Sequence, residues 1–324
     1  MSRNSYADHP KETAGPQQEF SPSVLTAIIT HNGAAELSGT LEALRGAASW
    51  PCPVFIVDNA SKDRTVDLLE KFAYPGLELL SLERNAGVAG ALNVALEKAG
   101  DASAKWLFIL DQDSRCSPGC LDVLFREAES LHESDRRTGA VCPVARSRKF
   151  PENIHMPYRW NGTRLTPVEF GEAEALEIDS TITSGTMYLV KALEDVGGFK
   201  EKYFIDFVDH ECHLRMRSAG WKIYWIRRAA LAHSLGKHQE MTPEGLWIEH
   251  EPWRYYYMMR NMIDGHHSFG GYKAVFAFLR DALRHARMLR RYGRSSNKCI
   301  WFMLKGMFHG FLGKLGPLAP RNRL

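Results

Sequence analysis

Short apolar runs alternate with stretches of helical periodicity over roughly the first third of the chain. The apolar runs are rich in β-branched and aromatic residues, which predicts buried strands at 24–30, 54–57, 77–82 and 106–110. Apolar positions three and four residues apart predict helices between them, at 36–45, 65–72 and 87–98. Since strands that alternate with helices form a parallel sheet covered on both faces, the pattern predicts an α/β fold.

The pattern is less regular beyond this region. Residues 141–178 are rich in loop formers, and the spacing then predicts two helices and a strand, at 190–196, 209–218 and 221–226. After Pro243 the chain is expected to be mostly helical.

Polar side chains cluster where each early strand is expected to end. These clusters fall at 30–32, 58–63, 85–87 and 111–113. In parallel sheets, ligands bind in the crevice beyond the carboxyl ends of the strands. Four loops that are distant in sequence are therefore predicted to meet at one binding crevice.

The most informative of these clusters contains Asp111 and Asp113, directly after the apolar run 106–110. Alternate carboxylates at a strand tip can both reach one hard cation, which prefers oxygen ligands. A divalent cation there could stabilise negative charge on a leaving diphosphate. The alternative is a pair of capping residues on a solvated loop, but the agreement with the other strand tips favours the metal site.

Composition places the chain among ordinary globular proteins. It has 324 residues, of which 44% are hydrophobic and 24% charged, and its six cysteines are expected to be reduced. No apolar run approaches the roughly 18 residues of a membrane-spanning helix. Residues 1–22 are polar, which predicts a disordered tail without the apolar core of a signal peptide and hence a cytoplasmic protein.

Charge is distributed unevenly along the chain. The formal net charge is +3, but residues 271–324 contain twelve Lys and Arg against one acid, Asp281, so this tail carries +11 and the rest −8. Apolar and basic residues recur there at helical spacing, which is typical of helices that lie on anionic membranes. The alternative is that the apolar stripe packs on the preceding domain. No nucleic-acid-binding motif is present, so nucleic acid is not expected as a partner.

Taken together in order, these segments resemble the family 2 glycosyltransferases. The resemblance covers about 23–262 and rests first on 28–32 (IITHN), 57–63 (VDNASKD), 85–93 (NAGVAGALN) and 110–114 (LDQDS). Three later segments are similar to the bacterial rhamnosyltransferase subgroup, namely 204–215 (FIDFVDHECHLR), 232–236 (AHSLG) and 254–261 (RYYYMMRN).

The resemblance implies a GT-A fold, a nucleotide-diphosphate-sugar donor, and Mg²⁺ or Mn²⁺ as cofactor. It assigns Asp58 to the nucleotide base, Asp111 to the ribose region and Asp113 to the metal, which His233 can complete. The donor pocket would also include Thr30, His31, Asn32, Asn85, Gly87 and Gln112. From the residues alone, Asp58 could instead be a turn residue, Gly87 a packing glycine and His233 a satisfied core histidine.

The resemblance also assigns the acceptor side of the site. It implies inversion at the anomeric carbon with Asp209 as general base, although Asp209 could instead cap a surface helix. Glu211 would orient the acceptor or support Asp209. Ser184 and Gly185 would lie beside the sugar or acceptor, or form a tight turn. Relatives often have Thr-Glu-Trp-Cys after this aspartate, whereas residues 210–213 are His-Glu-Cys-His, so the acceptor contacts are expected to differ.

We therefore expect a GT-A catalytic domain at 23–240, with a nucleotide-sugar half at 23–115 and an acceptor half at 116–240, followed by a helical, basic and amphipathic region at 241–324. The function implied is transfer of L-rhamnose from dTDP-rhamnose to a polyprenyl-diphosphate-linked glycan for cell-surface polysaccharide, at the cytoplasmic face of the inner membrane. The alternatives are a UDP-sugar donor carrying galactofuranose, glucose or N-acetylglucosamine, and a nucleotide-sugar-binding protein without turnover.

Overall fold

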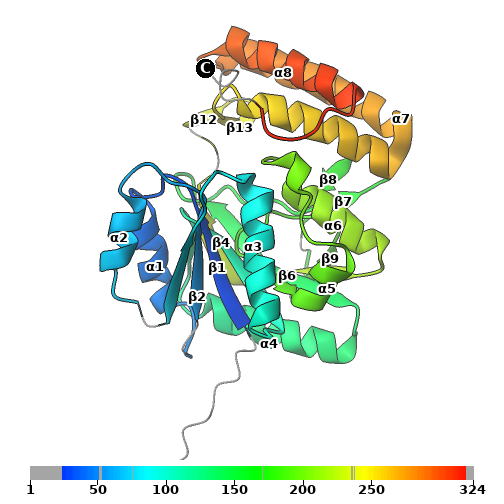
Figure 1. Cartoon of the computed structure of the whole chain (residues 1–324). Coiled ribbons are helices and arrows are strands. Elements are labelled where there is room, and N and C mark those ends of the chain that lie inside the picture. Colours follow the sequence, from blue (N-terminus) through cyan, green and yellow to red (C-terminus); the bar gives the residue numbers. More distant parts are fainter. Residues whose placement is uncertain are drawn as a thin grey trace, which may run out of the picture.

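The computed structural model describes residues 24–50, 53–74, 76–169, 171–234, 236 and 238–318; the predicted polar tail at 1–22 lies outside them. Its strands in the central sheet are β1 (Val24–Thr30), β2 (Val54–Asp58), β3 (Leu77–Ser81), β4 (Trp106–Asp111), β5 (Arg115–Cys116), β6 (Thr138–Ser147), β9 (Ala175–Ile178), β10 (Met187–Leu189) and β11 (Lys222–His233). They form a nine-stranded sheet in the order β3-β2-β1-β4-β10-β6-β11-β5, and β9 also pairs with β11 (Figure 1). The pairs among β1 to β4 are parallel, as the strand–helix alternation predicts.

Helices cover both faces of this sheet. They are α1 (Leu37–Arg45), α2 (Thr65–Lys71), α3 (Gly87–Asp101), α4 (Cys120–Ser134), α5 (Val190–Asp195) and α6 (Val208–Ser218), with a 3₁₀ turn at Glu201–Tyr203. α3 packs over β1, β2 and β4, while α4 packs over β6, β10 and β11. The predicted α/β fold with a mostly parallel sheet is confirmed.

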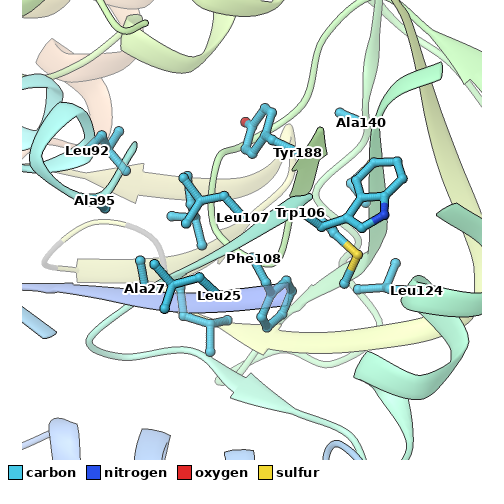
Figure 2. Packing of buried hydrophobic residues seen from close by; sticks show 14 of the residues in the cluster. Leu25, Ala27, Leu92, Ala95, Trp106, Leu107, Phe108, Leu124, Ala140 and Tyr188 are labelled. Atoms are coloured by element: carbon cyan, nitrogen blue, oxygen red, sulfur yellow. The ribbon is translucent and has the colours of Figure 1, made fainter. Parts of the chain in front are cut away.

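The core consists of large side chains that alternate between the two faces of β4. Leu107 points to the side of α3, where Figure 2 shows it near Leu92 and Ala95. Trp106 and Phe108 point to the other side, toward α4, and all three β4 side chains are fully buried. Because both faces are covered, β4 is a continuous apolar run until its last residue.

Parallel pairing brings the ends of β1, β2 and β4 to one edge of the sheet. Thr30, the last residue of β1, pairs with Asp58 at the end of β2. One position earlier, Ile29 pairs with Asp111 at the end of β4. Polar residues that are about 30 and 80 positions apart in sequence therefore share one edge, as the strand pattern predicts.

The second half contains features that the sequence pattern did not predict. The strand predicted at 221–226 continues to His233, and an irregularity in its pairing with β6 falls between Ile226 and Ala230. Another is a β-hairpin of β12 (His238–Thr242) and β13 (Gly245–Glu249), which was not predicted, although the described chain after it is mostly helical, as expected. A second small hairpin, β7 (Tyr158–Trp160) with β8 (Leu165–Pro167), interrupts the loop-rich middle segment.

Two long helices complete the chain. α7 (Arg254–Tyr292) and α8 (Ser296–Phe311) pack against one another, and Figure 1 shows them as a layer beyond the end of the sheet where β1 and β4 finish. α7 is interrupted at Gly271, whose φ of 61° and ψ of −160° are not helical. Within the described part of the chain, no helix combines the length and hydropathy that crossing a bilayer requires.

Candidate active site

A cavity of about 560 Å³ opens at the edge of the sheet where β1 and β4 end. Its wall comes from eight separate parts of the chain: the tips of β1, β2 and β4, the start of α3, the segments 182–183 and 205–210, the end of β11, and the beginning of α7 with the residues before it. Of the residues predicted to bind ligand, it is lined by Thr30, His31, Asp111, Gln112, Asp113, Asp209 and His233. We refer to this cavity as the cleft.

Asp111, Asp113 and His233 form a compact cluster of possible metal ligands. One ligand atom from each lies within 4.8 Å of the other two. The His233 Nδ1 atom is 3.4 Å from Asp113 Oδ1, and His233 Nε2 is 3.8 Å from Asp111 Oδ2. Two carboxylate oxygens and one imidazole nitrogen suit Mn²⁺ and, with less preference for the nitrogen, Mg²⁺.

The sheet itself brings the histidine to the two aspartates. β5 pairs antiparallel with β11, so that Arg115 lies opposite Ala232 and Cys116 opposite Leu231. The turn between β4 and β5 carries Asp113, and it is thereby held against His233, the last residue of β11. Because this contact depends on a strand that extends seven residues beyond the predicted one, the sequence pattern alone could not position it.

Two serines support the cluster from behind. The Asp111 backbone N–H donates to Ser184 Oγ at 2.9 Å, and the hydroxyls of Ser184 and Ser114 are 2.6 Å apart. Ser114 Oγ in turn lies 3.0 Å from His233 Nδ1. Gly185 has a φ of +81°, and a Cβ there would lie 2.7 Å from Leu231 Cδ2. Ser184 and Gly185 are therefore placed beneath the carboxylates, not among the residues that line the cleft on the acceptor side.

The charges in the cluster perturb one another. Desolvation in the cleft raises the pKa of Asp111 to about 6, with smaller contributions from the carboxylates of Asp113 and Asp209 and an opposing one from His233. The Asp111 side chain keeps 41% of its accessible area, so its desolvation is incomplete. The nearby carboxylates are therefore the better supported cause of the raised pKa. Burial disfavours the imidazolium form of His233, but its hydrogen bond to Asp113 and the charge of Asp111 outweigh this, and the pKa of His233 is raised. Such mutual repulsion between carboxylates is relieved by a cation.

Gln112 connects the β4 tip to the β1 tip. Its Oε1 accepts hydrogen bonds from Thr30 Oγ1 and from the His31 backbone N–H, both at 2.8 Å. His31 Nδ1 lies 2.9 Å from the backbone carbonyl of Asn59. These contacts bring Thr30, His31 and Gln112 together along one wall of the cleft.

The remaining predicted donor residues lie behind this wall and shape its loops. Asp58 is 1% exposed and accepts the Ser61 backbone N–H at 3.1 Å. Ser61 Oγ also receives the Asn32 backbone N–H at 2.8 Å. Asn85 Oδ1 accepts the Gly87 N–H at 2.8 Å, at the beginning of α3. None of Asn32, Asp58, Asn85 or Gly87 is among the residues that line the cleft as the described part of the chain defines it.

Gly87 is placed by close approach of another backbone segment. Its φ is +78°, and a Cβ would lie 2.4 Å from the carbonyl oxygen of Phe204. That carbonyl accepts the next N–H, from Val88, at 2.6 Å. The glycine therefore allows α3 to begin directly against the segment that leads to Asp209.

Asp209 is the second residue of α6 and faces the cleft. Its side chain is 23% exposed, and its Oδ1 accepts the His210 backbone N–H at 2.8 Å. Among the described residues, no lysine or arginine lies within ion-pair distance of its carboxylate. A carboxylate of this kind at the rim of a cavity is available to accept a proton.

Glu211, predicted to orient the acceptor or to support Asp209, does not line the cleft. Its side chain is 6% exposed and is held by Arg215, which donates from Nε at 2.9 Å and from Nη2 at 2.8 Å. Arg215 Nη2 also donates to the carbonyl of Gly198 at 2.7 Å. Glu211 therefore holds Arg215, which ties α6 to the loop after α5, and Glu211 does not line the cleft.

Two residue groups at the cleft were not assigned by sequence reasoning. Asp206 is paired with Arg254 at the start of α7, through Arg254 Nε at 3.2 Å and a closer contact from Nη2. Asn59 is 3% exposed; its Oδ1 accepts the Ala86 N–H at 2.8 Å and its Nδ2 donates to the Gly87 carbonyl at 3.0 Å. Arg254 therefore has an acidic side chain as its partner in the cleft wall. Asn59 had only its position beside Asp58 as a signal.

Comparison with known proteins connects this site to an enzyme family. The family model described as glycosyl transferase family 2 matches residues 26–197. The chain is 28% identical over 253 residues to the dTDP-rhamnosyl transferase RfbF of Shigella flexneri, covering 74% of this chain and 78% of that protein. It is also 28% identical over 239 residues to an N-acetylglucosaminyl-diphospho-decaprenol L-rhamnosyltransferase of Mycobacterium tuberculosis, covering 64% and 76%.

A solved structure gives the same fold. The mannosyltransferase of Pyrobaculum calidifontis in complex with GDP-Man and Mn²⁺ superposes with a TM-score of 0.55 at 16% identity, over 94% of this chain and 91% of that one. The GT-A type of α/β fold, with a helical C-terminal region, is the fold expected from the sequence resemblance.

Proposed function

Because the chain belongs to glycosyl transferase family 2, we propose that it moves L-rhamnose from dTDP-rhamnose to a lipid-linked glycan acceptor, for cell-surface polysaccharide. The chain is a glycosyltransferase by family. The observation that carries the proposal is that one cleft contains both the ligand cluster of Asp111, Asp113 and His233 and the carboxylate of Asp209.

The choice of sugar and acceptor rests on the relatives. Both of the rhamnosyltransferases named above match over most of their own length. The name of the first specifies a dTDP-rhamnosyl donor, and that of the second specifies an acceptor in which N-acetylglucosamine is linked through diphosphate to decaprenol. We assign the same classes of donor and acceptor to this chain.

The metal would be held by Asp113 and His233, with Asp111 beside them. A bound Mg²⁺ or Mn²⁺ supplies charge neutralisation for the two phosphates of the leaving nucleoside diphosphate. The chain contributes the arrangement of the ligands: the Ser184 hydroxyl fixes the Asp111 backbone, and Ser114 orients the His233 ring. Such partners behind the ligands hold them in position before the ion binds.

The donor nucleotide would lie against the β1 and β4 tips. Thr30, His31 and Gln112 form one wall of the cleft, and Asp58 and Asn32 set the two loops behind it. Asn85 and Gly87 fix the start of α3 at the same edge. In this arrangement the nucleotide occupies the side of the cleft formed by the first 115 residues.

Asp209 would act as the general base. The acceptor hydroxyl attacks the anomeric carbon of the donor, its proton passes to the Asp209 carboxylate, and the bond from that carbon to the diphosphate oxygen breaks. The nucleoside diphosphate leaves from the opposite face of the sugar, so the anomeric configuration inverts. This role requires a carboxylate that lines the same cleft as the metal ligands, and Asp209 meets that requirement.

The reaction would take place at the cytoplasmic face of the inner membrane, with the protein bound peripherally. Two observations support this location: a relative whose acceptor carries a decaprenol chain, and twelve basic residues against one acid in the last 54 positions. An anionic surface attracts such a segment.

Donor binding is the first test. Calorimetric titration with dTDP and with UDP, each with and without Mn²⁺, is expected to show tight binding of dTDP that depends on the ion. A preference for UDP would keep the transferase and discard rhamnose, and binding of neither would discard the donor assignment.

Turnover is the second test, with dTDP-rhamnose and a polyprenyl-diphosphate-linked N-acetylglucosamine. Asp209→Asn is expected to abolish transfer while dTDP binding stays within about twofold, since the base acts on the acceptor. Asp195→Asn is the matched control, because Asp195 pairs with Lys191 on the surface of α5. Transfer by Asp209→Asn at a rate close to the unmodified chain would remove Asp209 as the base.

A further inference from the structure

Large apolar side chains are exposed on one part of the molecule. Ten of them stand out in the described part of the chain, and eight belong to α7, α8 or the residue directly after α8. On α8 these are Trp301, Leu304, Phe308 and Phe311, followed by Leu312, each more than half exposed. Exposed apolar surface that is contiguous in this way marks an interaction site more often than solitary residues do.

The four α8 residues form a single stripe. Their spacing of three, four and three places them on one face of the helix. The opposite face, with Cys299, Phe302, Met303 and Gly306, is buried against α7. α8 is therefore apolar on both faces, and within the described residues only one of them is covered.

The second half of α7 extends the same surface. Tyr272, Phe276 and Leu283 are 70%, 67% and 54% exposed. Between the two helices lies a groove of about 450 Å³ whose walls are largely aliphatic, including Leu279 and Ile300. We refer to the exposed stripes of α7 and α8, together with this groove, as the hairpin face.

Charge distinguishes the possible occupants of the hairpin face. Arg287 and Arg290 line the groove, and Lys305 lies over the exposed Trp301 ring, with its Nζ 4.9 Å from the ring centroid. The acid of this region, Asp281, is already within 3.3 Å of Arg164 and 3.5 Å of Arg284. A second copy of the chain would bring a basic face against a basic face, whereas a bilayer of anionic lipid offers acyl chains to the apolar stripes and phosphates to the surrounding cations.

We propose that the hairpin face is the membrane-docking surface of this enzyme, inserting its apolar stripes among the acyl chains of anionic lipids. This proposal rests on the proposed function, because it assumes that the acceptor is embedded in a bilayer. Trp and Lys side by side are suited to the interface, because both have an apolar body and a polar tip.

Docking through the hairpin face also determines where the cleft lies relative to the membrane. α7 lines the cleft through Arg254, Met258 and Met262 before the break at Gly271, and it carries part of the hairpin face after that break. Docking would therefore hold the cleft next to the lipid surface, where a sugar on a polyprenyl diphosphate projects from the bilayer.

The test is sedimentation of the full chain with vesicles of phosphatidylcholine alone or with about 30 mol% phosphatidylglycerol added. The unmodified chain is expected to bind the anionic vesicles, and the double variant Trp301→Glu with Phe308→Glu to bind them at least about tenfold more weakly. The matched control is Leu80→Glu with Met241→Glu, which changes two exposed apolar residues elsewhere and should leave binding unchanged.

Binding of dTDP by each variant, measured by calorimetry, separates the two proposals. Retained dTDP binding together with lost vesicle binding supports the hairpin face independently of donor choice. Vesicle binding by the Trp301→Glu, Phe308→Glu variant equal to that of the unmodified chain would overturn the proposal. The proposal would also be overturned if the unmodified chain did not bind the anionic vesicles. In that case, a dimer of the unmodified chain that light scattering detects and that the variant lacks would identify a second copy as the occupant.

Discussion

Replacing Asn261 by alanine tests how the catalytic segment is held in position. Asn261 lies in α7, is completely buried, and directs its Nδ2 at the backbone carbonyls of Tyr203, Ile205 and Asp206, at 3.1, 2.9 and 2.7 Å. Its neighbour Arg260 is also completely buried and donates from Nη2 to the Tyr203 carbonyl at 2.9 Å. The two residues clamp the segment that leads into Asp209.

That segment has an unusual backbone. Within the described residues, six that are not glycine have positive φ, and three of them lie at 204–207: Phe204 at 68°, Asp206 at 64° and Phe207 at 63°. Such conformations cost about 1–3 kcal/mol each and persist only where the surroundings enforce them. Of these three residues the clamp contacts the carbonyl of Asp206, and it also holds the carbonyls of Tyr203 and Ile205 beside them.

The cost of Asn261→Ala can be worked out from these contacts. The Tyr203 carbonyl would keep Arg260 as a donor, so the carbonyls of Ile205 and Asp206 are the ones that lose a partner. Each unsatisfied buried carbonyl costs about 1–3 kcal/mol, so we expect the unfolding free energy to fall by about 2–6 kcal/mol. Because the same segment is strained, part of this change should appear as local release of residues 204–207.

The expected functional result is a fall in kcat of about tenfold or more with a smaller change in dTDP binding. Asp209 follows the released segment, whereas the nucleotide wall is built on the tips of β1 and β4. Rates would be measured at a temperature where denaturation curves show the variant to be folded. Asn161→Ala is the matched control, since Asn161 Oδ1 accepts two backbone N–H groups in an exposed turn away from the cleft. If folded Asn261→Ala kept the unmodified kcat, the clamp would serve stability alone.

Three further changes have defined outcomes. Gly87→Ala should destabilise by about 3 kcal/mol against about 1 kcal/mol for Gly162→Ala, measured by denaturant unfolding, because both have positive φ but only Gly87 meets a backbone carbonyl. Asp113→Asn should abolish the effect of Mn²⁺ on dTDP affinity in calorimetry, and an unchanged ion requirement would remove Asp113 from the metal site. Burial lowers the pKa of His213 to about 3, so between its unfolded value of 6.5 and that value only the unfolded chain gains a proton. Lowering the pH from about 7 to about 5 should therefore cost about 2 kcal/mol through this residue, and His213→Gln should flatten the dependence of unfolding free energy on pH.

The early strands and their polar tips could be predicted because local sequence determines them. A buried parallel strand is apolar at every position, so its end is visible where Asp58 or Asp111 interrupts the run. The cluster of Asp111 and Asp113 needs only β4 to form. The geometry of His233 depends instead on how far β11 continues past its bulge, which is decided by pairing with β5 and β6.

The errors have similar causes. The hairpin of β12 and β13 was missed although Pro243 and Gly245 bracket its turn, and Gly245 has a φ of 109°, as glycine allows. For Glu211 the resemblance implied a role in orienting the acceptor or supporting Asp209, and its pairing within the helix was not predicted. Arg215, four residues later on the same helix, was the available signal for an internal ion pair. Ser184 could not have been placed, because its partners lie about 70 residues away in sequence.

α7 explains why catalysis and docking should be considered together. At about 1.5 Å per residue, the ten positions from Met262 in the cleft wall to Tyr272 on the hairpin face span only about 15 Å, less any bend at Gly271. An acceptor free in solution would gain nothing from such proximity, whereas an acceptor fixed in a bilayer can reach only a cleft that is held close to the surface. The exposed apolar side chains of the hairpin face are costly for a protein in water. Because α7 carries part of this face together with Asn261 and Arg254, its position favours a substrate that is itself bound to lipid.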